Sequence, residues 1–228
     1  MEISDNNANS EFRFILLLAA LFATVLIPPY FEGGVWFGLI WKVVFTGSLL
    51  AAMYAIAGRK KVLFPAALLF FPTVATLWGG QLNEDNLLIF YLDNLTTIAF
   101  LGFASFHLGR HVLASRQVTV NVIYGSLCLY LLIGFIWAAI YSNIHLYYGE
   151  AFRFSNAADL GIESGGRHMG YFTYYSFVTL STLGYGDITP INKVAQAWST
   201  VEAMVGQFYI AIVLARLVSL HATKPPEA

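Results

Sequence analysis

The residues from Thr182 to Asp187 read Thr-Leu-Gly-Tyr-Gly-Asp, an order that suits the coordination of a dehydrated cation by backbone oxygens. A cation that leaves water needs replacement oxygen ligands, and a short strand supplies them if its carbonyls all face one way. Such a strand requires left-handed backbone at alternate positions, which Gly184 and Gly186 adopt at low steric cost. Thr182 adds a hydroxyl oxygen, and Tyr185 is large enough to brace the strand. The hexapeptide therefore predicts a cation-binding strand.

The longer segment from Tyr174 to Asp187 resembles the pore helix and selectivity filter of tetrameric potassium channels. The resemblance lies in an aromatic pair, in Thr and Ser before the filter, and in a closing acid, and its specific part covers roughly residues 171–219. It implies a homotetramer that conducts K⁺ passively, with K⁺ as the permeant ligand and no cofactor. The filter residues that it implies are Thr182, Leu183, Gly184, Tyr185 and Gly186, with K⁺ bound at the first four.

The same resemblance implies residues that support the filter from behind: Tyr174, Tyr175, Thr179, Ser181 and Asp187. In that family the closing acid anchors the outer end of the filter to the pore helix, so Tyr174 or Tyr175 is the expected donor to Asp187. Leu183 departs from the most familiar filters, which carry valine there. A poorly selective monovalent cation channel is therefore the alternative function, and a transporter or membrane scaffold is a more distant one.

The last apolar helix carries the remaining candidate residues of the pore. Gly206 follows Tyr185 by twenty-one positions, where the family has a glycine hinge. Helical spacing from Gly206 predicts that a set of residues faces the conduction path, and ordinary helix packing is the alternative for them: Gln207, Ile210, Leu214 and Ala215. Glu202, one turn before Gly206, either hydrogen-bonds behind the filter or satisfies backbone donors there.

The composition indicates a membrane protein independently of the motif. Hydrophobic residues make up 58% of the chain and charged residues only 11%, whereas a soluble domain has about 25% charged residues. The net charge of −1 argues against a nucleic-acid partner. Cys128 is the one cysteine, so no disulfide forms within the chain. The sequence contains neither a catalytic triad nor a zinc-type spacing, and we do not expect an enzyme.

Apolar runs predict an all-α polytopic membrane protein, since a helical span takes about 20 apolar residues. The expected spans are Phe12–Ile27, Val35–Ala57, Val62–Trp78, Asn86–His107, Val118–Tyr141 and Val194–Leu220. A shorter helix near Tyr171–Ser181 cannot cross and is expected to be re-entrant, leading into the filter loop. Irregular backbone at membrane depth is tolerated where it lines a water-filled path. The resulting fold class has six transmembrane helices per subunit in a four-fold symmetric tetramer.

The sequence therefore predicts that the chain divides into five parts. The expected parts are a cytoplasmic leader (1–11), a four-helix domain that resembles an uncharged voltage sensor (12–110), an interfacial linker (111–117), a pore domain (118–220) and a cytoplasmic tail (221–228). A single filter copy with no internal repeat requires four subunits around one axis. Membrane lipid is the only other partner that the sequence indicates.

Basic residues set the expected orientation in the cell membrane. With both termini cytoplasmic, eight basic residues lie inside: Arg13, Arg59, Lys60, Lys61, Arg110, Arg116, Arg216 and Lys224. Three lie outside: Arg153, Arg167 and Lys193. The excess on the inner side predicts that the filter is entered from the extracytoplasmic face.

The fourth apolar run lacks the charges of a voltage sensor. Residues 86–107 contain neither Arg nor Lys, whereas each charge that crosses the field contributes about 2.3 kcal/mol per 100 mV. We therefore expect little or no voltage dependence. Lys42 and Asp93 lie at similar predicted depth in the second and fourth runs. They form an intramembrane ion pair, or snorkel independently, or sense protons or ions.

Overall fold

The structure, a computed structural model, describes residues 2–31, 36–57, 60–79, 87–115, 119–149, 151–155 and 169–222. Within these ranges, side chains are described for 11–31, 36–57, 62–79, 87–115, 119–149, 151–155, 169–213 and 215–216. Several residues named above lie outside that part, either wholly or by their side chains: Arg59, Lys60, Lys61, Arg116, Arg167, Leu214 and Lys224.

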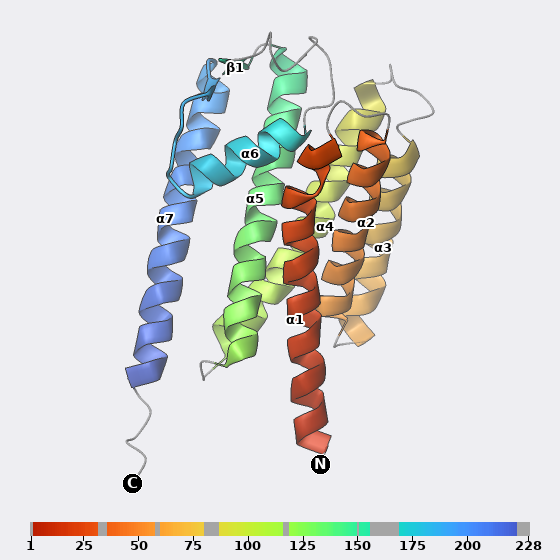
Figure 1. Cartoon of the computed structure of the whole chain (residues 1–228), viewed down its shortest axis with the longest axis vertical. Helices are drawn as coiled ribbons and strands as arrows, with labels where there is room; N and C mark the ends of the chain where they lie inside the picture. Colours follow the sequence, from red (N-terminus) through yellow and green to blue (C-terminus); the bar gives the residue numbers. More distant parts are fainter. Residues whose placement is uncertain are drawn as a thin grey trace. The chain divides into compact units, whose positions relative to one another are not determined.

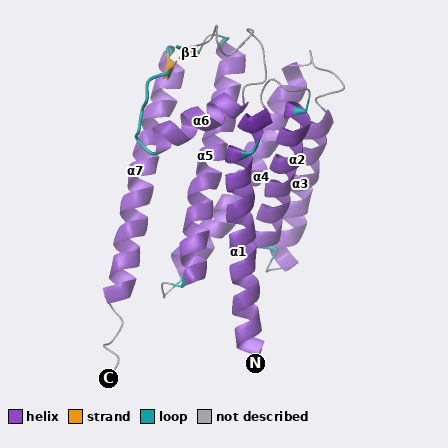
Figure 2. Ribbon diagram, in the orientation of Figure 1, coloured by secondary structure: helices purple, strands orange, loops and turns teal. Residues whose placement is uncertain are grey.

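The described chain is mostly helical (Figures 1 and 2). It divides into two compact units. The first unit comprises Met1–Ile133 and Leu217–Ala228, and the second comprises Gly134–Arg216. The long helix α5 (Val120–Tyr148) contributes its first half to one unit and its second half to the other.

The first unit contains four long helices in full, which run side by side in alternating directions (Figure 1). Their bounds, with one short 3₁₀ helix, are α1 (Glu2–Leu26), η1 (Pro28–Phe31), α2 (Phe37–Ile56), α3 (Lys60–Gly79) and α4 (Leu87–Ala114). Helix α1 ends just before Pro28, because proline lacks an amide hydrogen and cannot continue a helix. Helix α1 packs on α2, α3 packs on α4, and α2 contacts both α3 and α4.

Large apolar side chains fill the interior of this first unit. Among the most deeply buried are Leu17 and Leu21 on α1, Leu49 on α2, and Phe100 and Leu101 on α4. Many apolar side chains on the same helices are exposed, such as Phe64, Leu68 and Phe71 on α3. Helices that are apolar on both their buried and exposed sides are typical of a bilayer environment.

Five helices of the described chain are long and apolar enough to cross a membrane. The candidate spans are Glu11–Phe31, Phe37–Ile56, Val62–Gly79, Leu87–Ala114 and Val120–Tyr148. The all-α polytopic class therefore holds. The sixth expected span, Val194–Leu220, forms α7 (Lys193–Ala222), which does not join these five within the described residues. Polar residues such as Gln196, Glu202 and Gln207 lower its hydropathy.

The second unit holds the second half of α5 and the elements that follow it. They are β1 (Phe152–Phe154), α6 (Met169–Leu180), β2 (Ile188–Pro190) and most of α7. Helix α6 lies across the space between α5 and α7 (Figure 1). Its twelve residues span roughly 18 Å, too short for a hydrocarbon core of about 30 Å. The strands β1 and β2 pair antiparallel, with Arg153 opposite Thr189.

Three helix ends reach about two to three turns beyond the expected spans, and the other ends agree to within two residues. Helix α4 continues through Ala114, so the first residues of the expected 111–117 linker are helical, and α5 continues to Tyr148 rather than Tyr141. Neither extension meets a proline, and residues such as Leu and Ala favour continued helix. Helix α1 begins at Glu2 and therefore takes in the expected leader.

Lys42 and Asp93 both belong to the first unit. Lys42 is 7% exposed on α2, which contacts α4. Asp93 on α4 accepts a hydrogen bond from the Thr76 hydroxyl of α3 at 3.1 Å. The pairing of Lys42 with Asp93 stays a prediction.

Candidate functional site

The end of α6 is tied by backbone hydrogen bonds to the segment that follows it, residues 182–186, which is called the strand below. The amide of Thr182 donates to the carbonyl of Thr179 at 2.9 Å. The amides of Leu183 and Gly184 both donate to the carbonyl of Val178, at 3.0 and 3.3 Å. Carbonyls at a helix end lack donors within the helix, so the strand satisfies them. Three successive strand amides therefore point back toward α6.

The direction of these amides fixes the direction of the carbonyls. The described peptide bonds are all trans, and in a trans peptide the carbonyl of one residue points opposite to the amide of the next. The carbonyls of Ser181, Thr182 and Leu183 therefore point away from the end of α6. An ordinary strand would send successive carbonyls to opposite sides.

Backbone handedness explains how the strand departs from that ordinary alternation. The φ angles of Thr182, Gly184 and Gly186 are +59°, +60° and +80°. Left-handed backbone at every second residue turns alternate peptide planes over, so neighbouring carbonyls can face one side. The two glycines adopt it freely, whereas Thr182 is β-branched and strained there. Backbone strain at a non-glycine residue is typical of a functional position.

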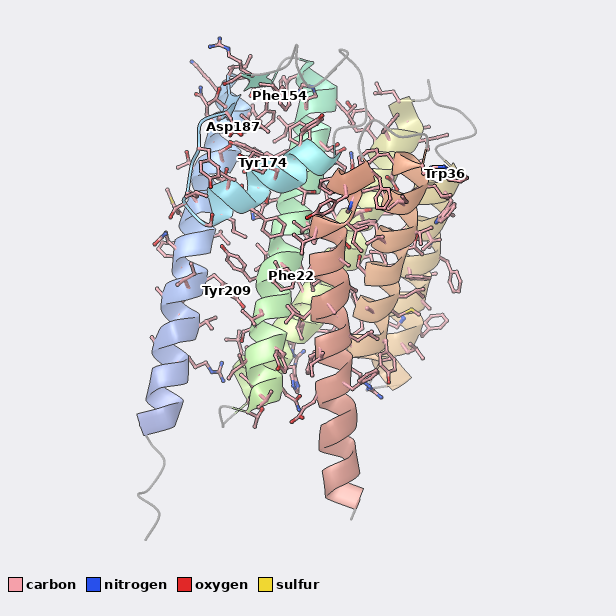
Figure 3. All side chains as sticks on the ribbon, in the orientation of Figure 1. Phe22, Trp36, Phe154, Tyr174, Asp187 and Tyr209 are labelled. Atoms are coloured by element: carbon pink, nitrogen blue, oxygen red, sulfur yellow. The ribbon has the colours of Figure 1, made fainter. Side chains whose placement is uncertain are left out.

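The outer end of the strand is held through Asp187. The Tyr174 hydroxyl donates to Asp187 Oδ2 at 2.6 Å, and the Ile188 amide donates to Asp187 Oδ1 at 3.0 Å. The rings of Tyr174 and Tyr185 are parallel, with centroids 6.5 Å apart. Figure 3 shows Tyr174 on α6 with Asp187 near it. Of the two expected donors, the structure places Tyr174 on Asp187.

A short β ribbon extends this hold to the loop after α5. The Ser155 amide donates to the Asp187 carbonyl at 2.8 Å, and the Ile191 amide donates to the Ala151 carbonyl at 2.9 Å. Together with the pairing of β1 and β2, these bonds clamp residues 151–155 to residues 187–191. Hydrogen bonds therefore fix both the backbone and the side chain of Asp187.

Aromatic rings from α5, α6 and β1 pack against one another. The ring of Tyr141 on α5 makes edge contacts with Phe152 and Tyr175, at centroid distances of 5.5 and 5.0 Å. Phe172 on α6 contacts Phe152 at 5.1 Å. Tyr175 does not reach Asp187; its hydroxyl shares a 2.6 Å hydrogen bond with Ser199 of α7. These contacts join α5, α6, β1 and α7.

Glu202 is the buried acid at the centre of this packing, with 0% of its surface exposed. The Tyr141 hydroxyl donates to Glu202 Oε2 at 2.5 Å, so the acid links α7 to α5. Glu202 Oε1 lies 2.5 Å from the Ser176 hydroxyl on α6. A buried carboxyl is costly unless it is hydrogen-bonded. Glu202 thus joins α5, α6 and α7.

The hydrogen bonds that the Ser176 hydroxyl can make depend on whether Glu202 is protonated. The Ser176 hydroxyl lies within hydrogen-bond distance of two acceptors, Glu202 Oε1 at 2.5 Å and the Gly134 carbonyl at 2.8 Å. A hydroxyl has one proton to donate. Both contacts are satisfied when Ser176 donates to Gly134 and a protonated Glu202 donates to Ser176.

Gly206 lies where α7 crosses the end of α6. A Cβ atom at this position would collide with the carbonyl oxygen of Leu180 and lie 2.9 Å from its carbonyl carbon. The colliding atoms are backbone, so no side chain can move aside. The close approach of the two helices requires glycine here, whether or not the position also bends as a hinge.

Gln207, next to this crossing, reaches the first residue of the strand. Its Nε2 donates to the Thr182 hydroxyl at 2.9 Å. Ile210 and Ala215 are exposed on the following turns of α7. The side chain of Leu214 lies outside the described residues. Gln207, Ile210 and Ala215, the described residues of the expected conduction path, are therefore exposed in the single chain.

The remaining expected supports stay close to α6. Thr179 uses its carbonyl to accept the Thr182 amide. The Ser181 hydroxyl lies 3.3 Å from the Val178 carbonyl, within the same turn. Sequence reasoning missed Tyr141, Ser176 and Ser199, which look like ordinary residues of apolar helices. Their one signal is a hydroxyl that needs a partner once it is buried.

Residues 125–222 match the model of a protein family described as "Ion channel". The matched range includes α6, the strand and α7. A comparison with curated proteins found no match. The family match and the membrane-type helices support an ion channel of the membrane rather than an enzyme.

Substituting Glu202 tests whether its hydrogen bonds, rather than its charge, hold the helices. We expect Glu202→Gln to change the free energy of unfolding by less than about 1 kcal/mol, because the amide both accepts and donates. Glu202→Ala leaves two hydroxyls without their partner and should cost about 2–5 kcal/mol. Thermal unfolding in detergent measures both, with Thr200→Ala on the exposed side of α7 as control. Equal damage from Gln and Ala would mean that a charged carboxylate is required.

Substituting Gly206 separates packing from bending. We expect Gly206→Ala to lower stability by about 1–3 kcal/mol, because its Cβ pushes α6 away from α7. Gly170→Ala, at a position with no atom within 4 Å of the added Cβ, is the matched control on α6. Thermal unfolding of both variants measures the difference. An unchanged melting temperature for Gly206→Ala would refute the packing role.

Proposed function

We propose that the protein is a potassium-selective channel in which residues 182–186 form the filter. The observation that carries this proposal is the set of three strand amides turned toward α6, which turns the carbonyls of residues 181–183 the other way. Rows of backbone carbonyls replace the hydration shell of K⁺ in channels. The Thr182 hydroxyl adds an oxygen at the inner end. The carboxyl end of α6 also carries partial negative charge, which favours a cation nearby.

The proposal includes a homotetramer. One strand presents oxygens from one side only, and a dehydrated ion needs them all round, so four copies around an axis complete the site. Exposure supports this assembly, since Leu183 and Tyr185 are 57% and 66% exposed in the single chain. Large apolar side chains at a filter would be covered by neighbouring subunits.

The inner path follows the exposed side of α7. Gln207 lies beside Thr182, and Ile210 and Ala215 follow toward the carboxyl end. Ile210 would contribute to an apolar ring that gates by losing its water. In this proposal α7 is the sixth span, both termini are cytoplasmic, and the filter opens to the outside.

Weak voltage dependence is part of the proposal. Arg110, near the carboxyl end of α4, is the only Arg or Lys of that helix. Its guanidinium carbon lies 5.8 Å from the ring centroid of Phe106. A voltage sensor needs several charges that move through the field, and α4 offers one near its end.

Reversal potentials in planar bilayers under opposed K⁺ and Na⁺ gradients test the proposal. We expect a reversal near the K⁺ equilibrium potential, which Gly184→Ala should abolish because alanine is strained at φ +60°. Gly149→Ala is the matched control, since it has φ +72°, open space around the added Cβ and a place outside the strand. A reversal near zero with clear single channels would favour the poorly selective cation channel, with Leu183 as the first residue to examine.

Internal Ba²⁺ block tests the role of Gln207 at the innermost site, because Ba²⁺ is close to K⁺ in size and needs the same oxygens. We expect Gln207→Leu to change the Ba²⁺ dissociation constant by about tenfold, since it removes a hydrogen bond that orients the Thr182 hydroxyl. Thr182→Ser, which keeps the hydroxyl, should change it little. Equal block in wild type and Gln207→Leu would show that Gln207 does not orient this site.

A further inference from the structure

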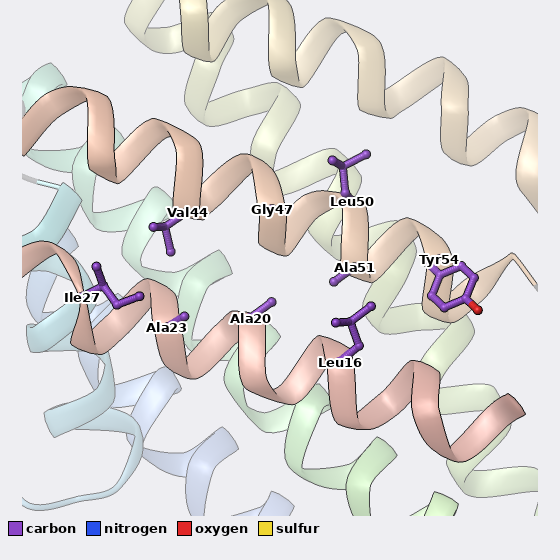
Figure 4. A pocket seen from close by; sticks show the side chains of 9 residues that line it. All are labelled: Leu16, Ala20, Ala23, Ile27, Val44, Gly47, Leu50, Ala51 and Tyr54. Atoms are coloured by element: carbon purple, nitrogen blue, oxygen red, sulfur yellow. The ribbon is translucent and has the colours of Figure 1, made fainter. Parts of the chain in front are cut away.

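Helices α1 and α2 enclose an apolar groove with a cavity volume of about 490 Å³ (Figure 4). Small residues create it, because Ala20 and Ala23 on α1 face Gly47 and Ala51 on α2. A Cβ added at Gly47 would meet no atom within 4 Å, so the space beside the helix is open. Both helices belong to the first unit, and both are candidate spans.

The groove has the length and direction of one lipid chain. It runs along the helices from Leu16 and Tyr54 at one end to Ile27 and Val44 at the other (Figure 4). At about 1.5 Å per residue, the stretch from Leu16 to Ile27 is about 16 Å long. A linear acyl chain that lies along the span fits this groove.

A cationic group lies at one end of the groove. The guanidinium carbon of Arg13 is 4.9 Å from the ring centroid of Tyr54, which lines that end. Among the described residues, no carboxylate pairs with Arg13, and its Nε has no hydrogen-bond partner. Arg13 is near the start of the Glu11–Phe31 span, at the depth of lipid headgroups. Guanidinium groups bind phosphate through paired charge-assisted hydrogen bonds.

We propose that this groove binds an anionic phospholipid, with one acyl chain between α1 and α2 and its phosphate on Arg13. The lipid belongs to the leaflet that holds the amino-terminal end of the first span. The apolar groove holds the acyl chain, and the guanidinium of Arg13 at its end favours an anionic headgroup over a zwitterionic one. The proposal does not depend on conduction or on which ion passes.

Native mass spectrometry of the full-length oligomer tests the proposal, using phosphatidylglycerol and phosphatidylcholine with identical acyl chains. We expect wild type to bind phosphatidylglycerol more tightly. Arg13→Gln should weaken that binding by about tenfold and leave phosphatidylcholine unaffected. Arg13→Lys should retain part of the preference, because it keeps the charge. An unchanged preference in Arg13→Gln would overturn the headgroup assignment.

Filling the groove with a larger side chain tests whether the acyl chain binds there. Gly47→Leu places a side chain in the open space and should weaken binding of both lipids by about tenfold or more, because several methylene groups lose their contact. Gly38→Leu, on the same helix with open space and outside the groove, is the matched control. Equal lipid binding by the two variants would overturn the proposal. Loss of the oligomer in Gly47→Leu, with lipid binding retained, would instead identify the groove as a contact between subunits.

Discussion

The amides of Thr182, Leu183 and Gly184 need acceptors, and the last carbonyls of α6 need donors, and each set satisfies the other. This mutual requirement is the interaction on which the site depends. In the proposed channel a membrane interior would offer no water to either set, so an unmade bond would cost several kcal/mol and the bonds would be obligatory. Once they form, trans geometry leaves the carbonyls of the strand directed away from the helix.

The rest of the second unit keeps α6 where those bonds can form. At its outer end, Tyr174 and the β ribbon fix Asp187. Behind it, Glu202 connects α6 to both flanking helices through Ser176 and Tyr141. At its inner end, the missing side chain of Gly206 lets α7 approach the Leu180 carbonyl. Polar contacts and close packing, rather than burial of apolar area, hold these elements. Such contacts are the attractive forces available between helices in lipid.

The helices of the first unit are also held by polar contacts and close packing, but their packing leaves a groove between α1 and α2. Polar links such as the bond between Thr76 and Asp93 join its helices, and buried leucine, alanine and phenylalanine side chains pack between them. Small residues usually bring helices together, yet between α1 and α2 they leave an open groove. A bilayer tolerates such a groove because lipid can fill it. In water the same surface would promote aggregation.

The sequence by itself determined the membrane class, most helix positions to within a few turns, and the two glycines that the strand needs. These features are local, since hydropathy and the freedom of glycine depend on the residue and its neighbours. The tertiary structure decided the rest. It chose Tyr174 over Tyr175 as the partner of Asp187, gave Thr182 its left-handed backbone, and connected Glu202 to Tyr141, sixty-one residues away in the chain. No spacing rule predicts such pairs, because α5, α6 and α7 must first pack before their hydroxyl and carboxyl groups can find partners.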